Sequence, residues 1–133
     1  MYAGLFVKIN GKVAPLLAIS AGFDKNYTGK NNIFLNGAFL SMDENYLKEK
    51  YDEIVEFSEL GEFINYPVKN YSKGMQAKLG FSVATAIKPD ILILDEPTSG
   101  LDPVSRDELI MLFRDYISDG KRSILFSTHI TSD

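Results

Sequence analysis

Two short apolar runs near the C-terminus, separated by a helical pattern, constrain the fold more than any other feature of this chain. The first run is Ile91 to Leu94, and the second is SILFST, from Ser123 to Thr128. A connection of this length allows the two strands to pair in parallel, and such crossovers are almost always right-handed. The pattern predicts an α/β fold with part of a parallel sheet and flanking helices, and with both strands buried on their two faces.

The helix between these strands has clear start and stop signals. Asp102 is a suitable N-cap, Pro103 suits the first helical position, and Gly120 is expected at the C′ position. The apolar positions repeat at helical spacing, as in a helix that packs one face on a sheet. They are Leu109, Leu112, Phe113, Tyr116 and Ile117.

The first half of the chain is expected to contain strands and then a loop. Residues 5–17 have β character on both sides of Gly11, with Pro15 limiting the second run. The stretch from Ser20 to Asn32 is rich in glycine, asparagine and aspartate, which predicts a loop.

Helical patterns follow this loop. The apolar stretch NIFLNGAFLS favours a helix, and Asp43 is a suitable N-cap for the next one. The stretch LGEFINYPVKNY reads as a connection broken by Pro67. A further helix is expected to start near Ser72 and to end before Pro89.

Composition excludes several classes of protein. The chain has 133 residues, 45% of them hydrophobic, a net charge of −4 and no cysteine. Nucleic acid is disfavoured as a partner because phosphate contacts need clustered positive charge. No stretch reaches the roughly 20 apolar residues of a membrane-spanning helix, and MYAGLFVKING lacks the basic leader of a signal peptide. These features fit a cytoplasmic protein.

Polar side chains follow both predicted strands. Asp95 and Glu96 end the first strand, and His129, the sole histidine, ends the second. Successive strand residues point to opposite sides, so one carboxylate can hold Mg²⁺ while the other orients a water. An isolated Asp-Glu pair at a strand end is more often solvated, and a lone histidine is more often structural. Ligands of open α/β sheets nevertheless bind at this edge.

A second candidate site lies at the start of the helix near Ser72. The free N–H groups and the positive end of the helix dipole favour a phosphate there, and Gly74 allows close approach. Taken alone, the segment SKGM is also explained as an ordinary helix cap.

Three segments in order resemble the ATP-binding cassette (ABC) family of ATPases, which has a P-loop NTPase fold. ILILDEPTSGLD resembles the Walker B motif and D-loop, NYSKGMQAKL resembles the signature motif, and the histidine after ILFST resembles the switch histidine. The resemblance implies that Asp95 binds Mg²⁺, that Glu96 is the general base and that His129 contacts the γ-phosphate. It also implies a D-loop from Ser99 to Asp102, with Asp102 as a further catalytic residue. The implied ATP-binding residues at the signature motif are Ser72, Lys73, Gly74 and Met75, of which Lys73 and Met75 depart from the common pattern.

A phosphate-binding loop of the form G-x-x-x-x-G-K-[ST] is absent from these residues. The three Gly-Lys pairs begin at Gly11, Gly29 and Gly120, and none has the required preceding glycine or following hydroxyl residue. The segment YTGKNN is therefore read as a loop and helix start. The resemblance implies that the chain begins after the phosphate loop and that Ala18 lies near the Q-loop. The chain alone is expected to bind ATP poorly, and missing strands are expected to leave apolar sheet surface exposed.

The resemblance further implies three segments of one incomplete domain. They are residues 1–22 with sheet strands and the Q-loop region, residues 23–88 with a helical subdomain, and residues 89–133 with the catalytic core. Gly11 to Met75 resembles polysaccharide and teichoic-acid exporter ATPases, which is the favoured activity, whereas the C-terminal part is closer to drug or peptide exporters. The implied partners are a membrane-spanning subunit, which would hold the protein at the inner face of the membrane, and a second ATPase subunit. A non-catalytic module that completes a partner's ATP site is an open alternative.

Overall fold

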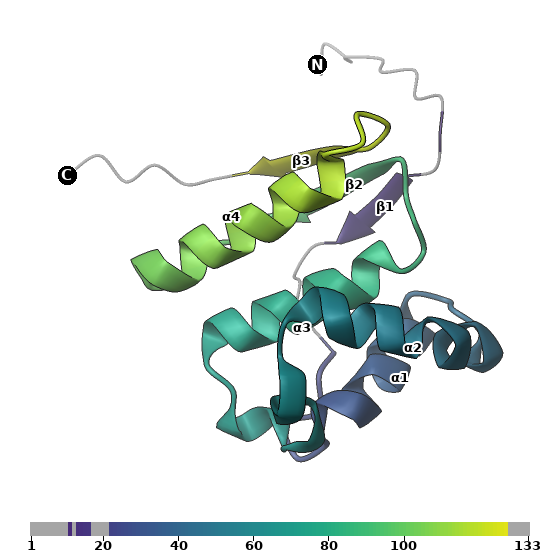
Figure 1. Cartoon of the computed structure of the whole chain (residues 1–133), viewed down its shortest axis with the longest axis vertical. Coiled ribbons are helices and arrows are strands. Elements are labelled where there is room, and N and C mark those ends of the chain that lie inside the picture. Colours follow the sequence, from purple (N-terminus) through teal and green to yellow (C-terminus); the bar gives the residue numbers. More distant parts are fainter. Residues whose placement is uncertain (1–10, 12, 17–21, 128–133) are drawn as a thin grey trace, which may run out of the picture.

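The computed structural model describes residue 11, residues 13–16 and residues 22–127 (Figure 1). Within these residues, three strands form one sheet in the order β1-β2-β3: β1 (Val13–Leu16), β2 (Ile91–Asp95) and β3 (Ser123–Ser127). Both pairings are parallel, as the strand-helix-strand pattern predicts. Pro15 lies inside β1, which has β2 as its one neighbour among the described strands. An edge position of this kind tolerates the missing N–H of proline.

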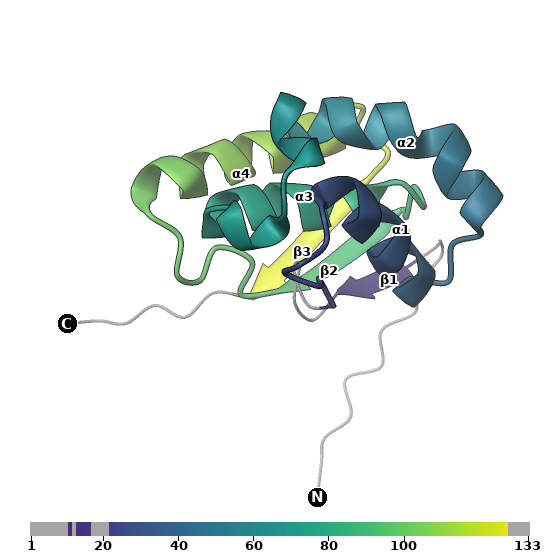
Figure 2. The same cartoon turned by 90° about the horizontal axis from the view of Figure 1, so that it is seen from below.

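The described helices lie on one side of the sheet and leave the other face uncovered (Figure 2). Leu92 and Leu94 are buried, whereas the alternate residues Ile91 and Ile93 are only half-buried, and Leu125 of β3 is 64% exposed. The prediction that both strands are buried on two faces is therefore wrong for these residues. The reason is that α4 (Pro103–Ile117) and α3 (Lys73–Thr85) cover a single face.

Side-chain caps start the helices in the first part of the chain. α1 (Gly29–Phe39) begins after Thr28, whose hydroxyl accepts from the Asn31 N–H, and α2 (Glu44–Ser58) begins after Asp43. The predicted loop from Ser20 to Asn32 is thus too long, because Thr28 caps a helix that already includes Gly29. The prediction that YTGKNN is a loop and helix start is confirmed.

The connection from α2 to α3 contains two short 3-10 helices, Gly61–Asn65 and Val68–Asn70, on either side of Pro67. The predicted start of α3 is confirmed, since Ser72 is its N-cap. α4 also begins as predicted, after the N-cap Asp102, and it ends at Ile117 with Ser118 as its C-cap. Gly120 follows two residues later with φ +70°, slightly beyond its predicted C′ position.

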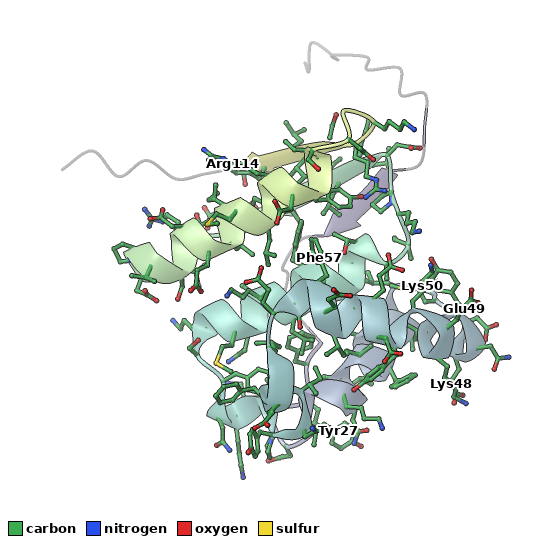
Figure 3. All side chains as sticks on the ribbon, viewed as in Figure 1. Tyr27, Lys48, Glu49, Lys50, Phe57 and Arg114 are labelled. Atoms are coloured by element: carbon green, nitrogen blue, oxygen red, sulfur yellow. The ribbon has the colours of Figure 1, made fainter. Side chains whose placement is uncertain are left out.

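α3 connects two hydrophobic clusters, because opposite sides of the helix are both buried. Phe81 packs into the cluster formed with the sheet and α4, and Phe57 of α2 reaches this cluster with its ring centroid 5.9 Å from that of Phe81 (Figure 3). Leu79 and Val83 pack into the second cluster, which joins α1, α2 and the 3-10 helices. Movement of α3 would therefore disturb both clusters. No helix among the described residues has the length and apolar character needed to cross a membrane.

Candidate functional site

Asp95 is the last residue of β2, and its carboxylate is anchored by the neighbouring strand. The parallel register places Asp95 opposite Ser127, the last residue of β3. The Ser127 hydroxyl donates a hydrogen bond of 2.6 Å to Asp95 Oδ1. Both residues are exposed at the carboxyl edge of the sheet. This is the edge at which open α/β sheets bind their ligands.

Glu96 does not continue the strand. Its φ is +44°, in the left-handed region that non-glycine residues adopt rarely. Its N–H donates to Ser127 Oγ at 3.2 Å. The expectation that Asp95 and Glu96 diverge through strand alternation is therefore corrected, since β2 has already ended where Glu96 turns.

Ser127 is the residue that sequence reasoning missed. It contacts both members of the acidic pair, one through a carboxylate and the other through a backbone N–H. The parallel pairing of the two strands was predictable, but the register that places Ser127 beside Asp95 was not. Had the strand register been known, Ser127 would have been identified as the residue opposite Asp95.

A tight turn leads from Glu96 to α4. The Ser99 N–H donates to the Glu96 carbonyl at 3.0 Å, and Gly100 has φ +74°. Asp102 then caps α4, with its carboxylate accepting from the Ser105 N–H at 3.1 Å. The pKa of Asp102 is held below its ordinary value, first by the hydrogen bond from the Ser105 side chain and then by that from its backbone. Asp102 thus caps α4, and the catalytic role that the resemblance implies for it stays a prediction.

The predicted signature residues lie at the start of α3. Ser72 Oγ accepts from the Met75 N–H at 3.1 Å, so this hydroxyl caps the helix. The side chains of Ser72 and Lys73 are exposed, Gly74 is buried, and Met75 packs half-buried against the helical cluster. Only Ser72 and Lys73 therefore present exposed side chains at the helix start, whereas Gly74 lies against Ser105.

The start of α3 lies against the segment that follows Asp95 and Glu96. A β-carbon added to Gly100 would lie 3.3 Å from Lys73 Nζ, and one added to Gly74 would lie 2.5 Å from Ser105 Oγ. The structure thus brings the predicted signature segment beside the predicted D-loop and the first turn of α4. His129 and Ala18 lie outside the described residues.

The donor set at this edge is compatible with Mg²⁺ and a nucleotide phosphate. Mg²⁺ takes one or two carboxylates and completes its shell with water and phosphate oxygens. Asp95 supplies one exposed carboxylate, and no cluster of three or more acidic, histidine or cysteine ligands occurs among the described residues. The start of α3 presents N–H groups, an exposed hydroxyl and the Lys73 ammonium, without an acidic residue in its first turn. Such a helix start favours an anion.

Comparisons with known proteins show what the chain is similar to. A family model described as "AAA domain, putative AbiEii toxin, Type IV TA system" matches residues 5–132. The O-antigen export system ATP-binding protein RfbB of Klebsiella pneumoniae is 42% identical over 127 residues, covering 96% of this chain and 51% of that protein. The teichoic acids export ATP-binding protein TagH of Lactococcus lactis is 43% identical over 121 residues, covering 91% and 26%.

A solved structure is similar in fold. The structure of cbiO1 from Clostridium perfringens, described as part of the ABC transporter complex cbiONQ, matches with a TM-score of 0.70 at 19% identity. The match covers 90% of this chain and 47% of that one. The chain therefore spans about half the length of the Klebsiella relative and of this solved protein, and about a quarter of the Lactococcus relative.

Proposed function

The chain belongs to the AAA domain family whose model matches residues 5–132, and from this premise we propose that it forms part of an ABC transporter ATPase that powers the export of a polysaccharide or teichoic acid. The observation that carries the proposal is the acidic pair Asp95–Glu96, fixed at the carboxyl edge of a parallel sheet by Ser127. The names of the O-antigen and teichoic-acid export relatives support this cargo class. A drug or peptide cargo is the alternative suggested by the C-terminal motifs.

Each site residue has a proposed role. Bound ATP would supply a terminal phosphorus atom that water can attack, and Mg²⁺ would partly neutralise the negative charge of the phosphate oxygens. Asp95 would hold the metal, Glu96 would accept a proton from the attacking water, and His129 would stabilise the terminal phosphate. Positioning and electrostatics supply most of the rate acceleration in such reactions.

The start of α3 would serve a second ATPase subunit. The Ser72 hydroxyl, the backbone at Gly74 and the Lys73 cation bind the phosphates of a nucleotide held by that subunit, with Met75 anchoring the helix start in the helical cluster. The turn from Ser99 to Asp102 lies beside this helix start. It would communicate between the two nucleotide sites of the dimer.

The remaining parts of the proposal concern partners and domain organisation. ATP hydrolysis would be coupled to conformational change in a membrane-spanning subunit. That subunit would also hold the ATPase at the inner face of the membrane. We propose that residues 23–88 are the helical subdomain and that residues 1–22 and 89–133 belong to the catalytic core. The two hydrophobic clusters on opposite sides of α3 support this division.

A chimera tests the catalytic proposal. Residues 1–133 would replace the matching 127-residue segment of the Klebsiella relative, and ATP hydrolysis would be measured after circular dichroism has shown that the protein is folded. We expect Glu96→Gln to lower kcat by about 100-fold or more, as for loss of a general base. Glu59→Gln is the matched control, because Glu59 also has a left-handed backbone, with φ +57°, but caps α2. A folded chimera whose hydrolysis survives Glu96→Gln would contradict the role of Glu96.

A non-catalytic module is the second candidate, favoured by the absence of a phosphate-loop motif from these residues and by the intact start of α3. Residues 1–133 would be mixed with an intact relative whose own signature serine is substituted. Rescue of hydrolysis that Ser72→Arg abolishes would support this module. In either case we expect isothermal titration calorimetry to show weak ATP binding by the chain alone, and tight binding would overturn that expectation.

A further inference from the structure

We propose that Ser127 is a positioning residue that fixes the Asp95 carboxylate and the backbone turn at Glu96 at the same time. This inference rests on the proposed ATPase function for its consequence, whereas its geometry stands independently. Ser127 is the last residue of β3, and its two partners are Asp95, the last residue of β2, and Glu96, which follows that strand. A single hydroxyl therefore connects the proposed metal ligand, the proposed base and the neighbouring strand.

The two hydrogen bonds determine which way the hydroxyl points. A serine hydroxyl has one proton to donate and lone pairs that accept. The carboxylate of Asp95 can only accept, so the proton lies in the 2.6 Å bond to Asp95 Oδ1. The lone pairs of Ser127 Oγ are then left to receive the Glu96 N–H at 3.2 Å. The arrangement uses the full donor capacity of the hydroxyl, and an apolar replacement would lose both bonds.

The bond to Asp95 leaves part of the carboxylate available for a metal. It engages Oδ1, while Oδ2 takes no hydrogen bond from the described residues. A hydrogen bond to one oxygen restricts rotation of the carboxylate and so orients the other oxygen. Groups outside the first coordination shell of a metal act in this way, and their loss typically costs 10–100-fold in affinity or activity.

The bond to Glu96 supports an unusual backbone conformation. The φ of +44° at Glu96 is sparsely populated by residues with a β-carbon, and such conformations persist only when their surroundings hold them. Ser127 Oγ is one group that holds this turn. The direction in which the Glu96 side chain leaves the sheet edge thus depends on the neighbouring strand.

Ser127 is also two residues before His129 in the sequence. A displacement of the end of β3 would change the orientation of Asp95 and the turn at Glu96 together.

Ser127→Val and Ser127→Thr are the decisive pair of variants, because their side chains have the same shape and differ in the hydroxyl. Ser123→Val is the matched control, since Ser123 is the exposed serine at the opposite end of β3. In the chain of residues 1–133, amide hydrogen exchange of Glu96 is measured by nuclear magnetic resonance. We expect exchange about tenfold faster in Ser127→Val, within the range for a lost hydrogen bond, and slower exchange restored in Ser127→Thr. Unchanged exchange in Ser127→Val would overturn the inference.

The catalytic consequence is measured in the chimera described above. We expect Ser127→Val to lower kcat about 10–100-fold and to raise the Mg²⁺ concentration at half-maximal rate, with little change in the KM for ATP. Ser127→Thr should restore most of kcat. Equal losses in Ser127→Val and Ser123→Val, or an unchanged kcat, would overturn the positioning role. Failure of the unsubstituted chimera to hydrolyse ATP would count against the ATPase proposal. The exchange measurement would still test the hydrogen bond between the Glu96 N–H and Ser127.

Discussion

Gly74 at the start of α3 lies so close to Ser105 in the first turn of α4 that no β-carbon fits between them. A β-carbon added to Gly74 would lie 2.5 Å from Ser105 Oγ and 2.6 Å from Ser105 Cβ. Real non-bonded atoms do not approach so closely, so a side chain at position 74 must separate the two helix starts. Packing against Ser105 thus requires a glycine at position 74.

Gly74→Ala should therefore destabilise the protein although alanine is the better helix former. We expect a loss of about 1–3 kcal/mol, the usual cost of overpacking, in urea unfolding followed by circular dichroism. The double variant Gly74→Ala/Ser105→Gly removes the atoms that collide and should recover most of this loss. Equal losses in the single and double variants would show that Ser105 is not the obstacle.

An ion pair also joins α3 to α4, and we expect it to matter more than a surface pair. Lys78 Nζ lies 2.8 Å from Glu108 Oε2, and the side chain of Lys78 is 11% exposed. Glu108→Gln leaves this nearly buried ammonium without its carboxylate, which should cost about 1–2 kcal/mol of unfolding free energy. The control is Glu44→Gln, because Glu44 and Lys48 form an exposed pair at 2.9 Å. That change should cost less than about 0.5 kcal/mol, and similar costs for both variants would contradict this ranking.

Local signals predicted much of the fold. Asp43, Ser72 and Asp102 were predicted as N-caps, and each accepts a hydrogen bond from a backbone N–H in the first turn. The parallel pairing of β2 and β3 and the α/β class were also predicted and are confirmed. These features depend on residues close in sequence or on the handedness of one crossover. They do not need knowledge of distant contacts.

Features that depend on contacts between distant residues were not predicted. The two hydrogen bonds of Ser127 connect residues 31 and 32 positions apart and require the strand register. The left-handed turn at Glu96 likewise follows from neighbours that no periodic pattern reveals, whereas exposed apolar sheet surface was expected and is found at Leu125. The missed parts of the site are therefore those set by tertiary packing.

Tyr71 should produce a pH dependence at high pH. Burial raises its pKa to about 12, and its hydroxyl donates to the Phe63 carbonyl. Because the ordinary pKa of tyrosine is about 10, the folded state retains a proton that the unfolded state releases. The stabilisation is complete below about pH 10 and is lost as the pH rises towards 12. The free energy of unfolding in urea should become less pH-dependent between these limits in Tyr71→Phe. Tyr66→Phe should not have this effect, because Tyr66 is 49% exposed. If the free energy of unfolding depends on pH equally in Tyr71→Phe and in the unsubstituted chain, the pH dependence does not come from Tyr71.

The sheet face that the described helices leave uncovered should make the chain alone associate. Leu125 is 64% exposed on β3 opposite Ile93, which is itself only half-buried, and exposed apolar strands attract further chains. Leu125→Glu should weaken association measured by sedimentation velocity. Burial of one leucine side chain is worth about 1.5–3 kcal/mol, so the association constant should fall about ten- to a hundredfold. Val104→Glu is the control, because Val104 is 67% exposed but lies in the first turn of α4. A chain that sediments as a monomer at all concentrations would refute the prediction, and equal effects of the two glutamates would show that added charge, rather than the sheet face, controls association.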